Sequence, residues 1–255
     1  PAHRAARHAA DAPDRVSPAA PAGTAPAWFT APGGGRLQLW PQKAAFDPDL
    51  RLLLVADAHI GKAVSFRRLG VPVPEATTDA ALQRLDALLH ATGAREVVFL
   101  GDLLHSARAH AAGTMAAVVA WRARHAGLAL TLVRGNHDAH AGDPPAALGV
   151  QVVDGPLRRG PWALLHEPVA VPGAYALAGH VHPGVVLAGR GGDRLRLPCF
   201  HFGPAVGVLP AFGPFTGLHI LPAGTGVRQF AVAGDAVQAL PTSWGRTAGR
   251  AGAPP

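Results

Sequence analysis

RLLLVADAH, at residues 51–59, is a run of five apolar residues that ends at Asp57 and His59. A continuous apolar run of this length is typical of a strand buried on both faces of a parallel sheet. EVVFLGD at 96–102 and LALTLVRGNHD at 128–138 repeat the pattern, and both also end in polar residues. Ligand sites in open α/β sheets lie beyond the carboxyl ends of the strands. We therefore expect the polar ends of these three strands to converge.

Two helices are predicted between these strands, over residues 75–92 and 109–126, because each segment has helical apolar spacing or ends before a glycine. Further strands are predicted at 36–40, 150–153, 162–165, 175–178, 184–188, 194–197, 205–209, 217–221 and 226–232. The first half thus follows a β-α-β-α-β pattern, and the second half is mostly β. This order predicts an α/β (α+β) fold in which a two-sheet β-sandwich is flanked by α-helices.

The two ends of the chain lack hydrophobic periodicity. Residues 1–30 are rich in alanine, proline and arginine, and residues 241–255 read PTSWGRTAGRAGAPP. Both segments are predicted to be disordered tails. A single folded domain is expected over residues 31–240, and hydrophobic residues, 49% of the chain, suffice for a sizeable core.

The composition restricts the class of protein further. A formal net charge of +7 suits a polyanionic partner such as nucleic acid, although ordinary surface charge explains it equally well. Cys199 is the only cysteine, which excludes an intramolecular disulfide and fits a cytoplasmic location. No apolar run reaches the length of a membrane span, so no membrane association is expected. The oligomeric state is left open.

Five polar clusters follow apolar runs and together offer seven candidate metal ligands. These are Asp57, His59, Asp102, Asn136, His166, His180 and His182. Carboxylate, amide and imidazole donors without thiolates suit Mn²⁺, Fe or Zn²⁺. A mononuclear site uses about three or four protein ligands, so seven indicate two ions that share a bridging carboxylate. Two such ions can clamp a phosphoryl group and activate a water, so hydrolysis needs no covalent enzyme intermediate.

Each cluster alone is weakly or moderately specific, and their order along the chain makes them informative. Together the five clusters resemble the motif set of the calcineurin-like metallophosphoesterase superfamily. The matching motifs are Asp57-x-His59, Gly101-Asp102, Gly135-Asn136-His137-Asp138, His166 and Gly179-His180-x-His182. The resemblance covers residues 36–232. Three longer stretches, residues 37–74, 99–110 and 196–217, are similar to one bacterial branch, the ligase-associated DNA-damage-response metallophosphoesterases, which are described as endonucleases.

The resemblance implies a role for each motif residue. One metal ion would be bound by Asp57, His59 and His182, the second by Asn136, His166 and His180, and Asp102 would bridge them. His137 would contact the phosphate and protonate the leaving oxygen, with Asp138 or a backbone group orienting it. Mn²⁺ is the expected ion, with Fe or Zn²⁺ as alternatives.

The resemblance also implies a substrate and partners. The substrate would be DNA, single-stranded or damaged, and the functional partners a DNA ligase and a nuclease or helicase of the same repair system. Basic residues near the metal motifs, His105, Arg108, Arg67 and Arg68, could contact phosphates, the alternative being solvated surface side chains. Glu167-Pro168 stands where many superfamily members have glycine, and this weakens any transfer of substrate specificity.

Two other functions compete with a DNA endonuclease. The first is a phosphatase or phosphodiesterase acting on nucleotides, small phosphoesters or phosphoproteins, which net charge does not separate from a nuclease. The second is a non-catalytic scaffold that has lost its metals. The presence of all seven candidate ligands disfavours the scaffold.

Overall fold

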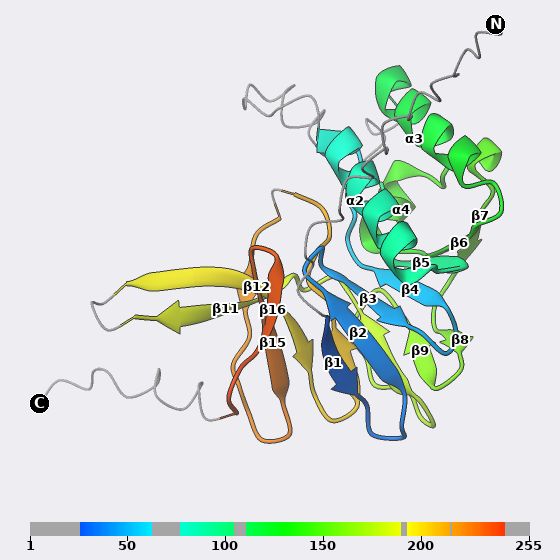
Figure 1. Ribbon diagram of the computed structural model, residues 1–255. Coiled ribbons are helices and arrows are strands. Elements are labelled where there is room, and N and C mark those ends of the chain that lie inside the picture. Colours follow the sequence, from blue (N-terminus) through cyan, green and yellow to red (C-terminus); the bar gives the residue numbers. More distant parts are fainter. Residues whose placement is uncertain (1–25, 63–76, 105–110, 190–192, 215, 243–255) are drawn as a thin grey trace, which may run out of the picture.

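The computed structural model describes residues 26–62, 77–104, 111–189, 193–214 and 216–242 (Figure 1). The first of its two sheets runs in the order β1 (Ala27–Thr30), β2 (Arg36–Trp40), β3 (Ala44–Asp47), β4 (Leu52–Val55), β5 (Glu96–Leu100), β6 (Ala129–Val133) and β7 (Val150–Val153). Strands β1 to β4 pair antiparallel, whereas β4 to β7 pair parallel. The carboxyl ends of the parallel strands therefore meet at one edge.

The second sheet is built from the rest of the chain. Its strands are β8 (Leu157–Arg159), β9 (Trp162–Leu164), β10 (Tyr175–Ala178), β11 (Pro183–Ala188), β12 (Arg194–Phe202), β13 (Val206–Val208), β14 (His219–Ile220), β15 (Arg228–Ala233) and β16 (Ala236–Ala239). The order is β14-β11-β12-β13-β10-β9-β8, and β15 joins β12 to β16. Strand β10 runs parallel to both β9 and β13.

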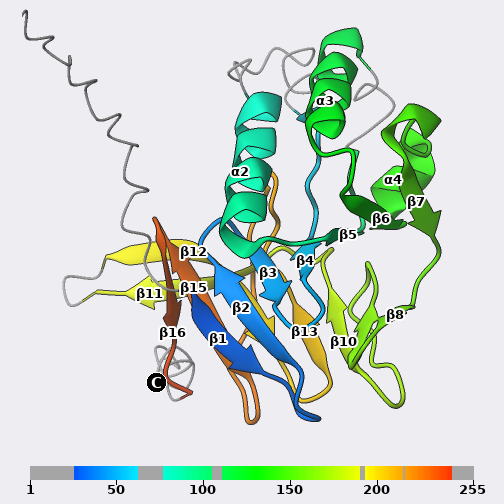
Figure 2. The same cartoon turned by 45° about the vertical axis from the view of Figure 1, so that its right-hand side comes forward.

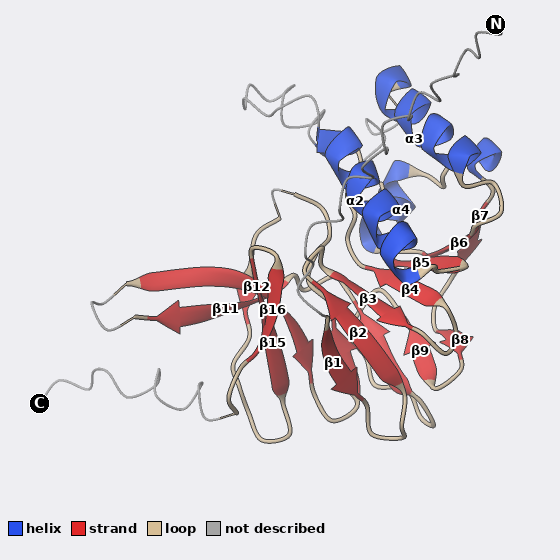
Figure 3. Ribbon diagram, viewed as in Figure 1, coloured by secondary structure: helices blue, strands red, loops and turns tan. Residues whose placement is uncertain are grey.

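Helices cover the first sheet on the face away from the second sheet (Figures 2 and 3). They are α2 (Thr77–Thr92), α3 (Ala112–Arg124), α4 (Asn136–Ala141) and the 3₁₀ turn η2 (Ala146–Leu148). Within the described ranges, none of these helices has the length and apolar character needed to cross a membrane. The predicted β-sandwich flanked by helices is thus confirmed.

Side-chain alternation explains why the central strands are apolar throughout. In β4, Leu52 and Leu54 pack between the sheets with Trp162, whereas Leu53 and Val55 face the helices. Neighbouring side chains of a strand point to opposite faces, so a strand covered on both sides needs apolar residues at every position. All four side chains are at most 1% exposed.

Some predicted boundaries were wrong. The predicted tail of residues 1–30 extends too far, because Ala27–Thr30 form β1, where Phe29 is buried and stacks on Phe202 with ring centroids 3.7 Å apart. The GNHD stretch, expected to be the polar end of a strand, begins helix α4 instead. Strands β3, β8 and β16 were not predicted, because they are only three or four residues long and are defined by pairing with neighbours. Residues 1–25 and 243–255 of the predicted tails lie outside the described residues.

Asp47 connects the two sheets inside their shared core, where it is 2% exposed. Its carboxylate accepts hydrogen bonds from Trp162 Nε1 at 2.7 Å and from the Leu50 N–H at 2.9 Å. Asp47→Ala would leave the buried indole N–H without its acceptor, so the free energy of unfolding should fall by about 1–3 kcal/mol. Urea denaturation measures this loss. Asp49→Ala, at an exposed position of the same turn, is the control, and equal stability of the two variants would contradict the assignment.

Candidate metal centre

The predicted ligands lie at the carboxyl ends of strands from both sheets. Asp57 and His59 follow β4, Asp102 follows β5, Asn136 follows β6, His166 follows β9, and His180 and His182 follow β10. Strands β4, β5 and β6 are mutually parallel in the first sheet, and β9 and β10 in the second. The expected convergence of the polar strand ends is therefore observed, with each sheet contributing part of the site.

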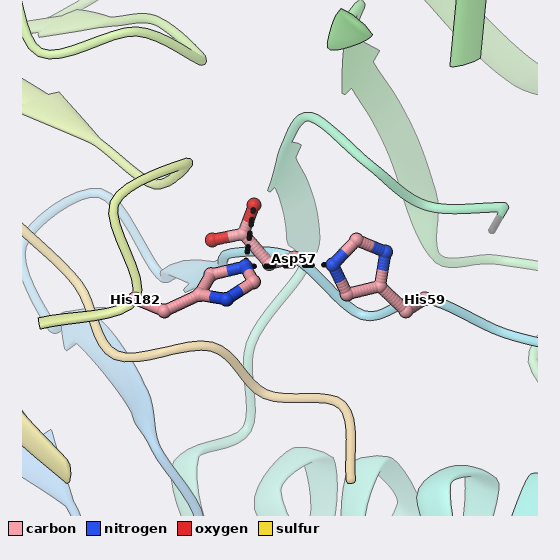
Figure 4. Close-up of side chains that lie close together, drawn as sticks. All are labelled: Asp57, His59 and His182. Carbon is pink, nitrogen blue, oxygen red and sulfur yellow. Dashed lines mark hydrogen bonds and ion pairs between the residues drawn. The ribbon is translucent and has the colours of Figure 1, made fainter. Parts of the chain in front are cut away.

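One group consists of Asp57, His59 and His182, whose ligand atoms all lie within 4.8 Å of one another. His59 Nε2 is 3.4 Å from His182 Nε2, and His182 Nε2 is 3.8 Å from Asp57 Oδ1. Figure 4 shows the rings of His59 and His182 turned toward each other with Asp57 beside them. These three are the residues that the family resemblance assigns to one metal ion.

Asn136, His166 and His180 form a second group. Asn136 Oδ1 is 2.8 Å from His166 Nε2 and 3.2 Å from His180 Nδ1, and the two ring nitrogens are 3.0 Å apart. Asn136 is the first residue of α4, and the two histidines lie in the loops after β9 and β10, so the three meet only in the folded chain.

Asp102 lies between the two groups and is 2% exposed. Its Oδ1 is 3.6 Å from His166 Nε2, and its Oδ2 is 4.0 Å from His59 Nε2. The two oxygens therefore face different groups, as a bridging carboxylate requires. The potential ligand atoms of Asp57, Asp102 and His166 also lie within 4.8 Å of one another. Asp57, a member of the first group, is therefore close to His166 of the second group as well.

The donor set fits divalent cations. A cation about 2.0–2.1 Å from each of two imidazole nitrogens separates those nitrogens by about 2.8–3.4 Å at octahedral or tetrahedral angles. The nitrogen pairs His59–His182 and His166–His180 have separations of 3.4 and 3.0 Å. Oxygen and imidazole donors suit Mn²⁺, Fe or Zn²⁺, and the geometry does not discriminate among them.

Backbone strain is concentrated at the same positions. Five of the seven predicted ligands, Asp57, His59, Asp102, His180 and His182, have φ between 46° and 69°. Left-handed backbone costs of order 1–3 kcal/mol at a residue other than glycine, and it persists only where surrounding contacts impose it. The fold thus holds these side chains in a conformation that their local sequence disfavours.

Backbone hydrogen bonds to buried carboxylates connect the loops. Asp57 accepts from the His180 N–H at 2.9 Å, and Asp102 Oδ1 accepts from the His137 N–H at 3.0 Å. Asp138, 1% exposed, accepts hydrogen bonds from the N–H groups of Asp102, Gly135 and Leu104 at 2.7, 2.9 and 3.2 Å, respectively. Asp138 therefore ties the loop after β5 to the loop after β6.

Asp138 was predicted to orient His137, and that role stays a prediction. The contacts of its carboxylate also give it a direct structural role. Burial raises the pKa of Asp138, and the charge of Asp102 adds to this, while the three backbone donors act in the opposite direction. Sequence reasoning missed this role, because a Gly-Asn-His-Asp motif does not reveal which backbone groups its last carboxylate accepts.

His137 lies beside the two groups, and its side chain is 42% exposed. Its Nε2 is 3.9 Å from Asp102 Oδ2, and its ring packs edge-on against His59 with centroids 5.2 Å apart. The ring is therefore reachable from solvent next to the predicted bridging carboxylate.

Lys62 is a basic residue near the site that the sequence analysis did not single out. Burial lowers the pKa of Lys62 more than the charges of Asp102 and Asp57 raise it. Its position three residues after His59 was the available signal. The predicted phosphate contacts His105, Arg108, Arg67 and Arg68 lie outside the described residues.

Glycine precedes Asp102 and Asn136 because the loops approach too closely for a side chain. A Cβ at Gly101 would lie 2.0 Å from His166 Nδ1, and the φ of Gly101 is 80°. A Cβ at Gly135 would lie 2.4 Å from Asp102 Oδ1. The glycines of the Gly-Asp and Gly-Asn-His-Asp motifs are thus required by the packing of the site.

The fold and the site together define a hydrolase that acts on phosphoester bonds. No family model and no curated protein matches the chain. Among solved structures, nuclease MPE from Pseudomonas putida is 44% identical, with a TM-score of 0.75, over 84% of this chain and 100% of that chain. YfcE, a phosphoesterase from E. coli, is 16% identical over 75% of this chain and 92% of that chain, with a TM-score of 0.35. The chain belongs to the family of nuclease MPE.

Gly101→Ala should remove metal binding from the second group. The added methyl would displace His166, and the left-handed φ of residue 101 would add strain. We expect about one equivalent of bound metal per chain, measured by elemental analysis after Mn²⁺ loading, against about two for the wild type. Gly113→Ala in α3, where a Cβ meets nothing within 4 Å, is the control. Full metal content in Gly101→Ala would refute the proposed role of His166.

Proposed function

We propose that the protein is a dinuclear metal-dependent endonuclease that cuts phosphodiester bonds in DNA. The observation that carries the proposal is the pair of nitrogen and oxygen donor groups joined by Asp102, in a chain 44% identical to a nuclease. Asp57, His59 and His182 hold one ion, Asn136, His166 and His180 hold the other, and Asp102 bridges them. Mn²⁺ is the proposed ion, with Fe or Zn²⁺ as alternatives.

The residues of the chain divide the chemistry between them. The two ions, when bound, supply Lewis acidity toward the phosphoryl group and lower the pKa of a water. Asp57 and Asp102, buried at 0% and 2% exposure, provide the negative charge that holds the cations. His137 donates a proton to the leaving oxygen. Its half-exposed imidazole next to Asp102 supports this role, since imidazole is the side chain that most often donates protons in general acid catalysis.

DNA is proposed as the substrate on two grounds. The similar structure is that of a nuclease, and the net charge of +7 is compatible with a polyanionic substrate. His105, Arg108, Arg67 and Arg68 are proposed to contact the phosphate backbone. We further propose a role in cytoplasmic DNA repair, alongside a DNA ligase and a nuclease or helicase, on the resemblance of residues 37–74, 99–110 and 196–217 to the DNA-damage-response branch.

A substrate panel separates this proposal from its main alternative. With Mn²⁺, a nuclease should hydrolyse bis-p-nitrophenyl phosphate and nick single-stranded DNA. A phosphatase specific for nucleotides, small phosphoesters or phosphoproteins should release phosphate from p-nitrophenyl phosphate alone. Activity confined to monoesters would exclude the DNA substrate, and metal analysis of the same preparation would identify the ion.

Substitutions of Asp102 and His137 should have unequal effects. Asp102→Ala removes the carboxylate that faces both groups, so both diesterase activity and metal content should fall. His137→Ala removes one proton donor, so it should retain two metal equivalents while kcat on DNA falls about 10²–10⁴-fold. Asp49→Ala is the control for purification and folding. Asp49 lies in an exposed turn before the amino end of β4, whereas the site lies beyond the carboxyl end. Equal, mild losses in the two site variants would contradict the two-metal assignment.

A further inference from the structure

The segment of residues 209–214, LPAFGP, joins the ligand-bearing ends of the two sheets, and we call it the crossover segment. At one end, the Leu209 N–H donates to Ala178 O at the end of β10, at 2.8 Å. At the other end, the Phe212 N–H donates to Ala56 O at 2.8 Å, and the Gly213 N–H donates to Asp57 O at 3.0 Å. The segment therefore spans from the strand that precedes His180 to the turn that carries Asp57.

The crossover segment packs tightly against the Asp57 turn. A Cβ at Gly213 would lie 2.6 Å from Ala58 O and 3.0 Å from Asp57 O. Asp57 and His59 have φ values of 49° and 46°, which their own sequence disfavours. The close backbone contact on this side is one of the constraints that keep the turn in that conformation.

Two basic side chains donate hydrogen bonds to backbone carbonyls of the crossover segment. Lys43, in the turn between β2 and β3, donates through Nζ to Gly213 O at 3.3 Å. Arg84, in α2, donates through Nη2 to Phe212 O at 2.9 Å, and its guanidinium lies 4.4 Å from the centroid of the Phe212 ring. Phe212 is fully buried, so the carbonyls that these cations bind lie in the interior.

Burying the charged side chains of Lys43 and Arg84 at this position costs desolvation free energy. Burial and the charge of Arg84 together lower the pKa of Lys43 to about 8, and burial also lowers the pKa of Arg84. Among the described residues, neither side chain forms an ion pair with a carboxylate. Apolar side chains of similar length would fill the same space without the cost of desolvating two charges. A role in packing alone therefore does not account for them.

We propose that Lys43 and Arg84 are positioning residues of the metal centre. By binding the carbonyls of Gly213 and Phe212, they hold the crossover segment in contact with the Asp57 turn. This contact in turn determines the affinity of the Asp57–His59–His182 group for its ion. This inference rests on the proposed metal-dependent function. It adds that the affinity depends on side chains that contact neither metal nor substrate.

The test measures Mn²⁺ binding to the metal-free full chain, by electron paramagnetic resonance of free Mn²⁺. Lys43→Met and Arg84→Met should each weaken one of two Mn²⁺ sites at least about tenfold, equivalent to ~1.4 kcal/mol. Arg122→Met is the matched control. Arg122 also donates to backbone carbonyls, those of Leu148 and Leu128, at 2.9 and 2.8 Å, but Leu128 precedes β6 and lies at the opposite edge of the sheet.

Conservative variants separate positioning from general stability. Lys43→Arg and Arg84→Lys keep a cationic donor, so their Mn²⁺ affinity should return to within about threefold of the wild type, about 0.7 kcal/mol. Thermal unfolding of every variant shows how much stability each has lost. Should the methionine variants not fold, Lys43→Gln and Arg84→Gln replace them, and the same tenfold weakening is expected.

The outcomes are distinguishable. A wild-type chain that binds no Mn²⁺ would contradict Mn²⁺ as the ion, and one that binds neither Mn²⁺ nor Fe nor Zn²⁺ would defeat the proposed function itself. A wild type that binds two ions, with folded Lys43 and Arg84 variants of unchanged affinity, would overturn the positioning role alone. Equal weakening in Arg122→Met would also overturn it, because a general loss of stability would then explain the effect.

Discussion

Buried carboxylates that accept backbone N–H groups are the interaction on which the site depends. Asp57 binds the backbone of His180, Asp102 binds that of His137, and Asp138 binds the loops after β5 and β6. The bonds from His180 to Asp57, from His137 to Asp102 and from Asp102 to Asp138 join segments that are distant in sequence, and the first joins the two sheets. Hydrogen bonds to a charged acceptor are about twice as strong as neutral ones. They explain how strained loops stay in register without a large apolar core between them.

The same carboxylates make a metal centre chemically reasonable. Asp57 and Asp102 are buried at 0% and 2% exposure, and a buried negative charge is costly unless cations or donors compensate it. Backbone N–H groups provide part of that compensation, and the proposed divalent ions provide the rest. Metal binding is then coupled to the stability of the loops, because the ligands are preorganised only in the folded chain.

The two-sheet architecture determines where this chemistry takes place. Parallel pairing of β4, β5 and β6 collects Asp57, Asp102 and Asn136 at one edge, and parallel pairing of β9 and β10 collects the histidines. The core between the sheets, with Trp162 and Phe200 fully buried, fixes the distance between the two halves. The crossover segment is a second connection between them, close to the site itself.

Residue order alone determined the central strands, the predicted ligand set and the family resemblance. Apolar runs such as LLLV reflect burial on two faces, and His/Asp/Asn motifs at strand ends reflect the topology of parallel sheets, so both are visible locally. Only the tertiary structure determined three other features. These are strand β1, the structural contacts of Asp138, and the hydrogen bond between Lys43 and Gly213, which are 170 residues apart. Their physical basis is pairing and hydrogen bonding between distant segments, which leaves no periodicity in the sequence because either partner alone is an ordinary polar or small residue.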